Sequence, residues 1–168
     1  MALQLFKIAD VLVENPVTSI TFSSIPQGYT DLIIKTSIRS TYASASPGFY
    51  LSFNGSTSTF TGRYIQGNLS TAISGSENRY GGQAAGGEAT ANTFSNDEIY
   101  IPNYTSSNYK SYSSDSVSEN NASSAGSAFI TLIAGLWSTT SAITSITIDL
   151  PTNRIINTNS TFTLYGIL

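Results

Sequence analysis

The sequence contains no His and no Cys, and charged residues make up only 10% of its 168 positions. Because His is the side chain that titrates nearest neutral pH, its absence removes the commonest general acid and base. A nucleophilic Ser would lack its usual base, and zinc or copper would lack their usual nitrogen and sulfur ligands. We therefore expect a protein that is not an enzyme and that holds no cofactor.

The lack of Cys also excludes disulfides, so packing, hydrogen bonds or oligomerisation must stabilise the fold. Seven Lys and Arg against ten Asp and Glu leave a net charge of −3, and the basic residues are scattered singly. This pattern is unsuited to binding nucleic acid. The alternating N-terminal residues do not resemble a signal peptide, and the longest apolar run, 128–137, is about half a membrane span. We expect no membrane insertion and synthesis in a cytoplasm.

Hydroxyl, amide and aromatic side chains are abundant instead. The chain has ten Tyr and eight Phe, and Ser, Thr and Asn together fill over a third of its positions. β-Branched and aromatic residues favour strands, and Tyr with Ser and Asn is typical of recognition surfaces. At this length we expect one domain spanning residues 1–168.

The hydrophobic pattern has a period of two and no amphipathic helix. The clearest strand is 31–39, in which Leu32, Ile34, Thr36 and Ile38 share one face. Further strands are expected at about 3–13, 19–22, 49–53, 59–65, 98–101, 109–113, 128–137, 145–150 and 161–168. Roughly nine or ten strands with polar turns predict an all-β fold, an antiparallel β-sandwich or jelly roll, with a closed β-barrel as the alternative.

Two connections have their own signatures. Asn54-Gly55 predicts a two-residue hairpin turn between 49–53 and a returning strand at 59–65, because both residues tolerate positive φ. The stretch at about 67–93 is rich in Gly, Ser and Ala and has few bulky residues. It is expected to form a long loop, which in a compact domain is either functional or mobile.

The acidic residues suggest little chemistry. Asp97 and Glu98 are adjacent, so on a strand they point to opposite faces and cannot flank one glycosidic bond. We expect both to form a charged, solvated strand entry. The acidic and amide side chains of Asp115, Glu119, Asn120 and Asn121 could offer oxygens to calcium, but their spacing matches no EF-hand loop and turn chemistry explains them more simply.

Aromatic residues provide the candidate interface or recognition positions. Four tyrosines fall within thirteen residues among Ser and Asn, and they either form a sugar-stacking or protein-binding surface or are partly packed against the sheet. The run 128–137 is apolar on both faces, so it is either covered on both sides or has one face against a neighbouring subunit. The candidates are Tyr100, Tyr104, Tyr109, Tyr112 and Trp137.

Three stretches and the C-terminus together resemble a known family. They are SITFSSIPQGYTDLIIKTSIRS at 19–40, EIYIPNYTSSNYKSYSSDSVSENNA at 98–122, LIAGLWSTTSAITSITIDLP at 132–151 and the terminal TFTLYGIL. They are similar to β-rich virion structural proteins encoded by tailed phages of marine and cyanobacterial hosts. The likeness extends from about residue 19 to the end, and its middle motif is the most specific.

The resemblance implies a bacteriophage structural protein on the virion surface, made in the host bacterial cytoplasm. It would be a capsid decoration or cement protein, or a tail or fibre component, and it transfers no catalytic residue. We expect a homo-oligomer, with a homotrimer favoured, because shared burial stabilises a fold without disulfides. The alternative is a carbohydrate-binding module that contacts host surface glycans through the tyrosines at 100–112. A depolymerase would need facing carboxylates from distant strands.

Overall fold

The computed structural model of the chain describes residues 4–68, 70–119, 121 and 128–168. Among these residues it contains twelve strands and one short 3-10 helix, η1 (Pro151–Asn153). The strands are β1 (Leu5–Leu12), β2 (Ser19–Phe22), β3 (Asp31–Ser37), β4 (Gly48–Phe53), β5 (Phe60–Gly67), β6 (Ala72–Gly75), β7 (Tyr80–Gln83), β8 (Asn96–Ile101), β9 (Lys110–Ser118), β10 (Phe129–Trp137), β11 (Ile146–Asp149) and β12 (Thr161–Ile167).

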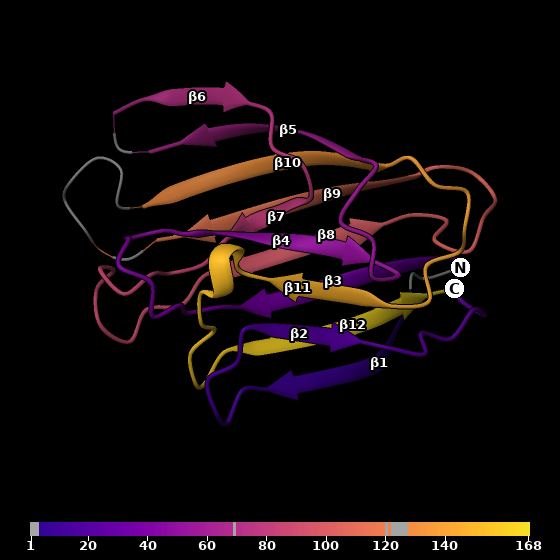
Figure 1. Cartoon of the computed structure of the whole chain (residues 1–168), viewed down its shortest axis with the longest axis horizontal. Helices are drawn as coiled ribbons and strands as arrows, with labels where there is room; N and C mark the ends of the chain where they lie inside the picture. The colour runs from indigo at the N-terminus through magenta and orange to yellow at the C-terminus, as the bar shows by residue number, and fades with distance from the viewer. Residues whose placement is uncertain (1–3, 69, 120, 122–127) are drawn as a thin grey trace.

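The strands form two antiparallel sheets (Figure 1). The larger sheet has eight strands in the order β1-β12-β3-β8-β9-β10-β5-β6, and the smaller has four in the order β2-β11-β4-β7. The predicted all-β sandwich is confirmed, with twelve described strands in place of nine or ten. The larger sheet is open, since β1 and β6 are its two edges, so the closed-barrel alternative is wrong.

Side chains from both sheets form one core between them. In β3, Leu32, Ile34 and Thr36 are buried and Lys35 is exposed, as the period-two pattern predicts. Rings form the centre of the core near β10. The Trp137 ring stacks on Phe60, with ring centroids 6.2 Å apart, and meets Phe53 edge-on at 5.6 Å. Aromatic pairs of this kind contribute beyond their buried area.

The predicted hairpin at Asn54-Gly55 is wrong, although the turn itself forms with positive φ at both residues. β4 pairs with β11 on one side and β7 on the other, so no edge is free for β5. β5 pairs with β10 and β6 in the other sheet. The chain therefore crosses between sheets after the turn. Asn54 Oδ1 accepts the backbone N–H groups of Thr144 and Ser145, which fixes the turn beside β11.

The expected long loop at about 67–93 is also wrong in part, because β6 and β7 lie inside it. β7 reads Tyr-Gly-Gly-Gln and has none of the β-branched residues that signal a strand. Its glycines permit close packing between the sheets. A Cβ built on Gly82 would lie 2.7 Å from the Phe49 ring and 2.8 Å from the Ser116 hydroxyl.

Hydroxyl groups on the inner face of β9 form hydrogen bonds with the backbone groups that the edge strand β7 leaves unpaired. Edge strands leave backbone donors and acceptors unpaired, and buried ones need partners. Three such contacts are Tyr112 Oη donating to Tyr80 O at 3.0 Å, Ser114 Oγ donating to Gly81 O at 2.6 Å and Ser116 Oγ accepting Gln83 N–H at 2.8 Å. Part of the unusual Ser content is therefore buried and structural.

The smaller sheet covers only part of the larger one. β7, its edge, packs against β9 and β10. β5 and β6 continue past that edge (Figure 1). Tyr64, on the inner face of β5, is consequently half-buried, and Ile73 on β6 is exposed. The protein thus has two surfaces of interest near β5, one on each face of the larger sheet.

Candidate interaction surface

The outer face of β5 and β10 carries large aliphatic side chains in contact with solvent. Ile130 is 64% exposed, Ile65 60% and Leu132 51%. Leu132 lies directly opposite Ile65 in the antiparallel register, and Ile130 is the next outward residue on β10. We call these three residues the apolar strip.

The strip follows from the sequence of β10, which is apolar on both faces. Its inner face, with Ile133 and Trp137, is buried in the core. The run 128–137 is therefore not covered on both faces within the chain. The smaller sheet covers its inner face, and its outer face is exposed. Contiguous exposed apolar side chains of this kind are typical of contact sites.

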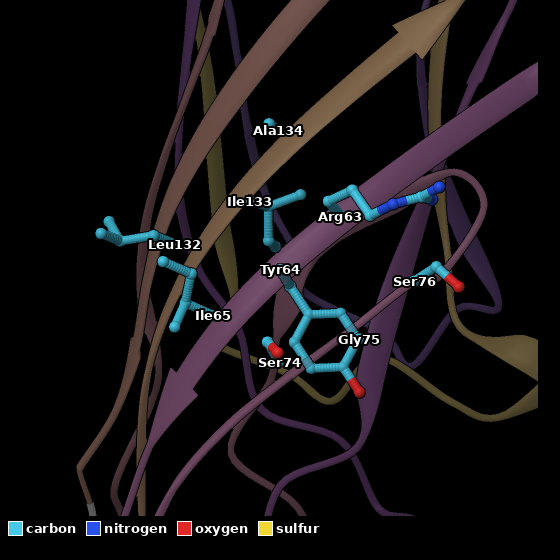
Figure 2. Close-up of a pocket in the computed structure, with 9 residues that line it drawn as sticks. All are labelled: Arg63, Tyr64, Ile65, Ser74, Gly75, Ser76, Leu132, Ile133 and Ala134. Carbon is cyan, nitrogen blue, oxygen red and sulfur yellow. The ribbon is translucent and has the colours of Figure 1, made fainter.

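A groove borders the strip on the same face. Its volume is about 630 Å³, and Figure 2 shows its lining from three neighbouring strands and the turn after β6. Ile65 and Leu132 lie together at one side of the view, and Arg63 lies at the other (Figure 2). The lining residues are 63–65, 74–76 and 132–134.

Opposite charges border the strip. Arg63 on β5 pairs in register with Ala134, and Asp115 on β9 pairs with Leu132, so the two charges lie on opposite sides of β10. Both residues are exposed, and no ion pair joins either to another described residue. The nearby charges of β3 and β8 are paired with each other, Lys35 with Glu98 at 2.8 Å. Arg63 and Asp115 are therefore available to a partner.

The four predicted tyrosines do not form one exposed surface. Tyr104 and Tyr112 are buried, and Tyr104 donates its hydroxyl to the carbonyl of Pro26. Tyr100 and Tyr109 are exposed, and Tyr100 donates to the Asp31 carboxylate at 2.7 Å. Half of the four rings are therefore packed inside the protein, which is one of the two alternatives that the sequence left open.

Trp137 is a core residue, so it is not available as an interface position in the folded chain. The outward residues of the same strand, which sequence reasoning did not single out, are exposed instead. Alternation along β10 separates its inward residues from its outward ones. It could not show which of the two groups faces the smaller sheet. Asn120, part of the suggested calcium cluster, lies outside the described residues.

Asp97 is the functional-looking group that sequence reasoning placed wrongly. It points away from Glu98, as expected, but it is 1% exposed rather than solvated. Its carboxylate accepts hydrogen bonds from Ser116 at 2.5 Å, Ser95 at 2.7 Å and Thr36 at 2.8 Å. Burial raises the pKa of Asp97 to about 7, against the opposing effect of the three hydroxyl donors.

The Asp97 carboxyl has a raised pKa, as catalytic acids often do, but it is buried and no substrate can reach it. Its hydroxyl partners belong to β3, β9 and the residue before β8, and Ser116 connects it to β7 through the backbone of Gln83. Buried networks of this kind rigidify a core when every member is satisfied. We therefore interpret Asp97 as the centre of a structural network between the sheets.

Lys110 is the second buried charge, and it too is paired with nearby atoms of the chain. Its Nζ donates to the carbonyl oxygens of Ser106 at 2.7 Å and Asn108 at 2.5 Å, and burial lowers its pKa. The ammonium thus closes the turn between β8 and β9. Both buried charges serve the fold.

None of the described residues belongs to a helix long and apolar enough to cross a membrane. Comparisons with known protein families, with curated proteins and with solved structures find no match to this chain.

Proposed function

We propose that the protein is a non-enzymatic structural component of a bacteriophage virion surface that assembles as a homotrimer. It would decorate or cement the capsid, or form part of a tail or fibre. The proposal rests on one observation above all, the apolar strip on the outer face of the larger sheet. The motifs at 19–40, 98–122 and 132–151 support the assignment to a virus particle.

The strip supports assembly on energetic grounds. Fully burying an exposed Ile or Leu side chain contributes about 1.5–3 kcal/mol, and the three strip residues are still 51–64% exposed, so covering them would contribute roughly half of that for each. The chain lacks disulfides, and burial shared between subunits would add to the stability of each. The outer face of β10 is also poor in charge, which is typical of the centre of protein interfaces.

The charges beside the strip favour a second copy of the same chain as the partner. Around a three-fold axis, one margin of each strip meets the opposite margin of its neighbour. Arg63 of one copy would then approach Asp115 of the next, and the three apolar strips would face the axis. Complementary charges of this kind fix the register of an assembly and exclude wrong partners.

Light scattering on the purified protein tests the assembly. We expect about 53 kDa, three times the mass of the 17.8-kDa chain. Co-sedimentation with phage capsids and with isolated tails then tests the location on the particle. A stable monomer that binds neither would contradict the proposal.

Carbohydrate binding through Tyr100, Tyr104, Tyr109 and Tyr112 is the second candidate from the sequence. Stacking on sugars needs exposed ring faces, and Tyr104 and Tyr112 are buried. Glycan recognition by this segment would have to use Tyr100 and Tyr109. A different group of tyrosines, from β4, β5 and β7, offers better geometry for it.

A further inference from the structure

A small pocket opens where β5 and β6 extend past the edge of the smaller sheet. Its volume is about 140 Å³. At about 30 Å³ for each water molecule, it has room for roughly five waters. The pocket lies on the inner side of β5, on the face opposite to the apolar strip. It is lined by Gly48, Tyr50, Tyr64, Gln66, Glu77 and Tyr80.

Three tyrosine rings form its aromatic part. Tyr80 is the central ring, with its centroid 5.6 Å from that of Tyr64 and 6.2 Å from that of Tyr50. The planes are inclined by 70° and 46°, so the rings surround a hollow instead of stacking flat. A Cβ built on Gly75 would lie 2.6 Å from the Tyr64 hydroxyl, so Gly75 makes room for this ring beside β6 (Figure 2).

Polar groups with unused hydrogen-bonding capacity also line the pocket. Gln66 is only 7% exposed, yet its side-chain amide forms no hydrogen bond with another of the described residues. The Tyr80 hydroxyl likewise has no partner in the part of the chain that the structure describes. The buried side-chain atoms without a partner among the described residues are Trp137 Nε1 and Arg154 Nε, so the polar atoms of Gln66 and Tyr80 are accessible from the pocket. They are therefore open to hydrogen bonding by a ligand that enters it.

The charges around the pocket select the ligand class. Glu77 contributes a carboxylate on the side of Tyr50, and its negative charge disfavours an anion such as a phosphate. The Arg79 guanidinium lies over the Tyr50 ring, 5.5 Å from its centroid, and pairs with Asp149 at 3.2 Å. The guanidinium already occupies one face of the Tyr50 ring, so the pocket offers less open aromatic surface to a quaternary ammonium ligand. A neutral ligand with many hydroxyls remains.

We propose that this pocket binds a single neutral sugar ring of a glycan. The tyrosine rings would contact the C–H groups of the sugar, while the Gln66 amide, the Glu77 carboxylate and the Tyr80 hydroxyl would bind its hydroxyls. Such sites combine aromatic contact area with a few placed polar groups. Because the pocket lies on the face opposite to the apolar strip, a trimer formed through the strip leaves it accessible.

Saturation-transfer NMR on the full-length protein tests the site. The probes are the methyl glycosides of glucose, galactose and mannose, N-acetylglucosamine and, as the competing class, choline. We expect transfer to at least one sugar and none to choline. Gln66→Leu and Tyr80→Phe should each weaken sugar binding about fivefold or more, since each removes one hydrogen bond.

Tyr109→Ala is the matched control, because it removes an exposed ring of the 100–112 segment and leaves the pocket intact. Gly75→Ala, which displaces the Tyr64 ring, provides a variant that removes no polar group. The unfolding temperature of each variant shows whether it is folded. Sugar binding lost in Tyr109→Ala and kept in the pocket variants would overturn the proposal. So would choline binding, or the absence of sugar binding up to tens of millimolar. None of these outcomes bears on the mass of the assembly.

Discussion

The hydroxyl of Ser116 donates a hydrogen bond of 2.5 Å to Oδ1 of Asp97. The Oγ of Ser116 in turn accepts a hydrogen bond from the backbone N–H of Gln83 at 2.8 Å. One serine therefore connects a buried carboxylate of the larger sheet to the edge strand of the smaller sheet. The abundance of Ser, which in the sequence suggests an adhesive surface, is here a means of closing the sandwich.

Ser116→Ala should destabilise the protein, because it leaves the Gln83 N–H and one carboxylate oxygen without this partner. Each buried group left unpaired costs about 1–3 kcal/mol. Urea unfolding of the variant measures the loss. Ser113→Ala is the matched control, since Ser113 lies on the same strand and points to solvent. Equal midpoints for both variants would refute the role of the Ser116 hydroxyl.

The Asp97 carboxyl should make the free energy of unfolding depend on pH in an unusual direction. Its pKa is about 7 when folded, against an ordinary value of 3.8. Between these values the folded state holds a proton that the unfolded state has released, so stability falls as pH rises. The slope approaches about 1.4 kcal/mol per pH unit, and stability levels off above pH 7.

Urea unfolding at several pH values checks this prediction, with Asp97→Asn as the control. The amide is neutral at every pH, so the variant should lose this decrease between pH 4 and pH 7. A decrease of the same size in the variant would mean that Asp97 is not its source.

Gly82→Ala should also destabilise the fold. Its φ of 156° is one that residues with a side chain rarely adopt. The nearby Phe49 ring and Ser116 hydroxyl also leave no room for a methyl group. Overpacking of this kind costs about 1–3 kcal/mol. Gly28→Ala is the comparison, because no atom lies within 4 Å of a Cβ at that position. Thermal unfolding of both variants should separate them, and an unchanged Gly82→Ala midpoint would show that the sheets can move apart there.

The strands could be predicted where one face is buried and the pattern has a period of two. β2 and β11 are examples, with alternating buried and more exposed positions. β7 could not be predicted, because its two glycines carry no hydrophobic signal and are needed for their small size. Its burial depends on Phe49 and on the hydroxyls of β9, which are distant in sequence.

The sequence also could not predict which of the two sheets each strand joins. The Asn54-Gly55 turn forms as its residues predict, yet the strands on either side belong to different sheets. A local turn signal cannot reveal that β4 already has two neighbours. Similarly, alternation predicts that Trp137 and Leu132 point in opposite directions, but it does not say which face the smaller sheet covers. For the same reason, the sequence could not show which of the four candidate tyrosines are buried and which are exposed.

The mass of a strip variant in solution tests the central claim most directly. Leu132→Asp places a charge in the apolar strip, whereas Leu12→Asp makes the same change at a residue 56% exposed on β1, at the far edge of the same sheet. Sedimentation velocity should give a trimer for the wild type and for Leu12→Asp, and a folded monomer of 17.8 kDa for Leu132→Asp. A Leu132→Asp protein that remains trimeric would contradict the proposed interface.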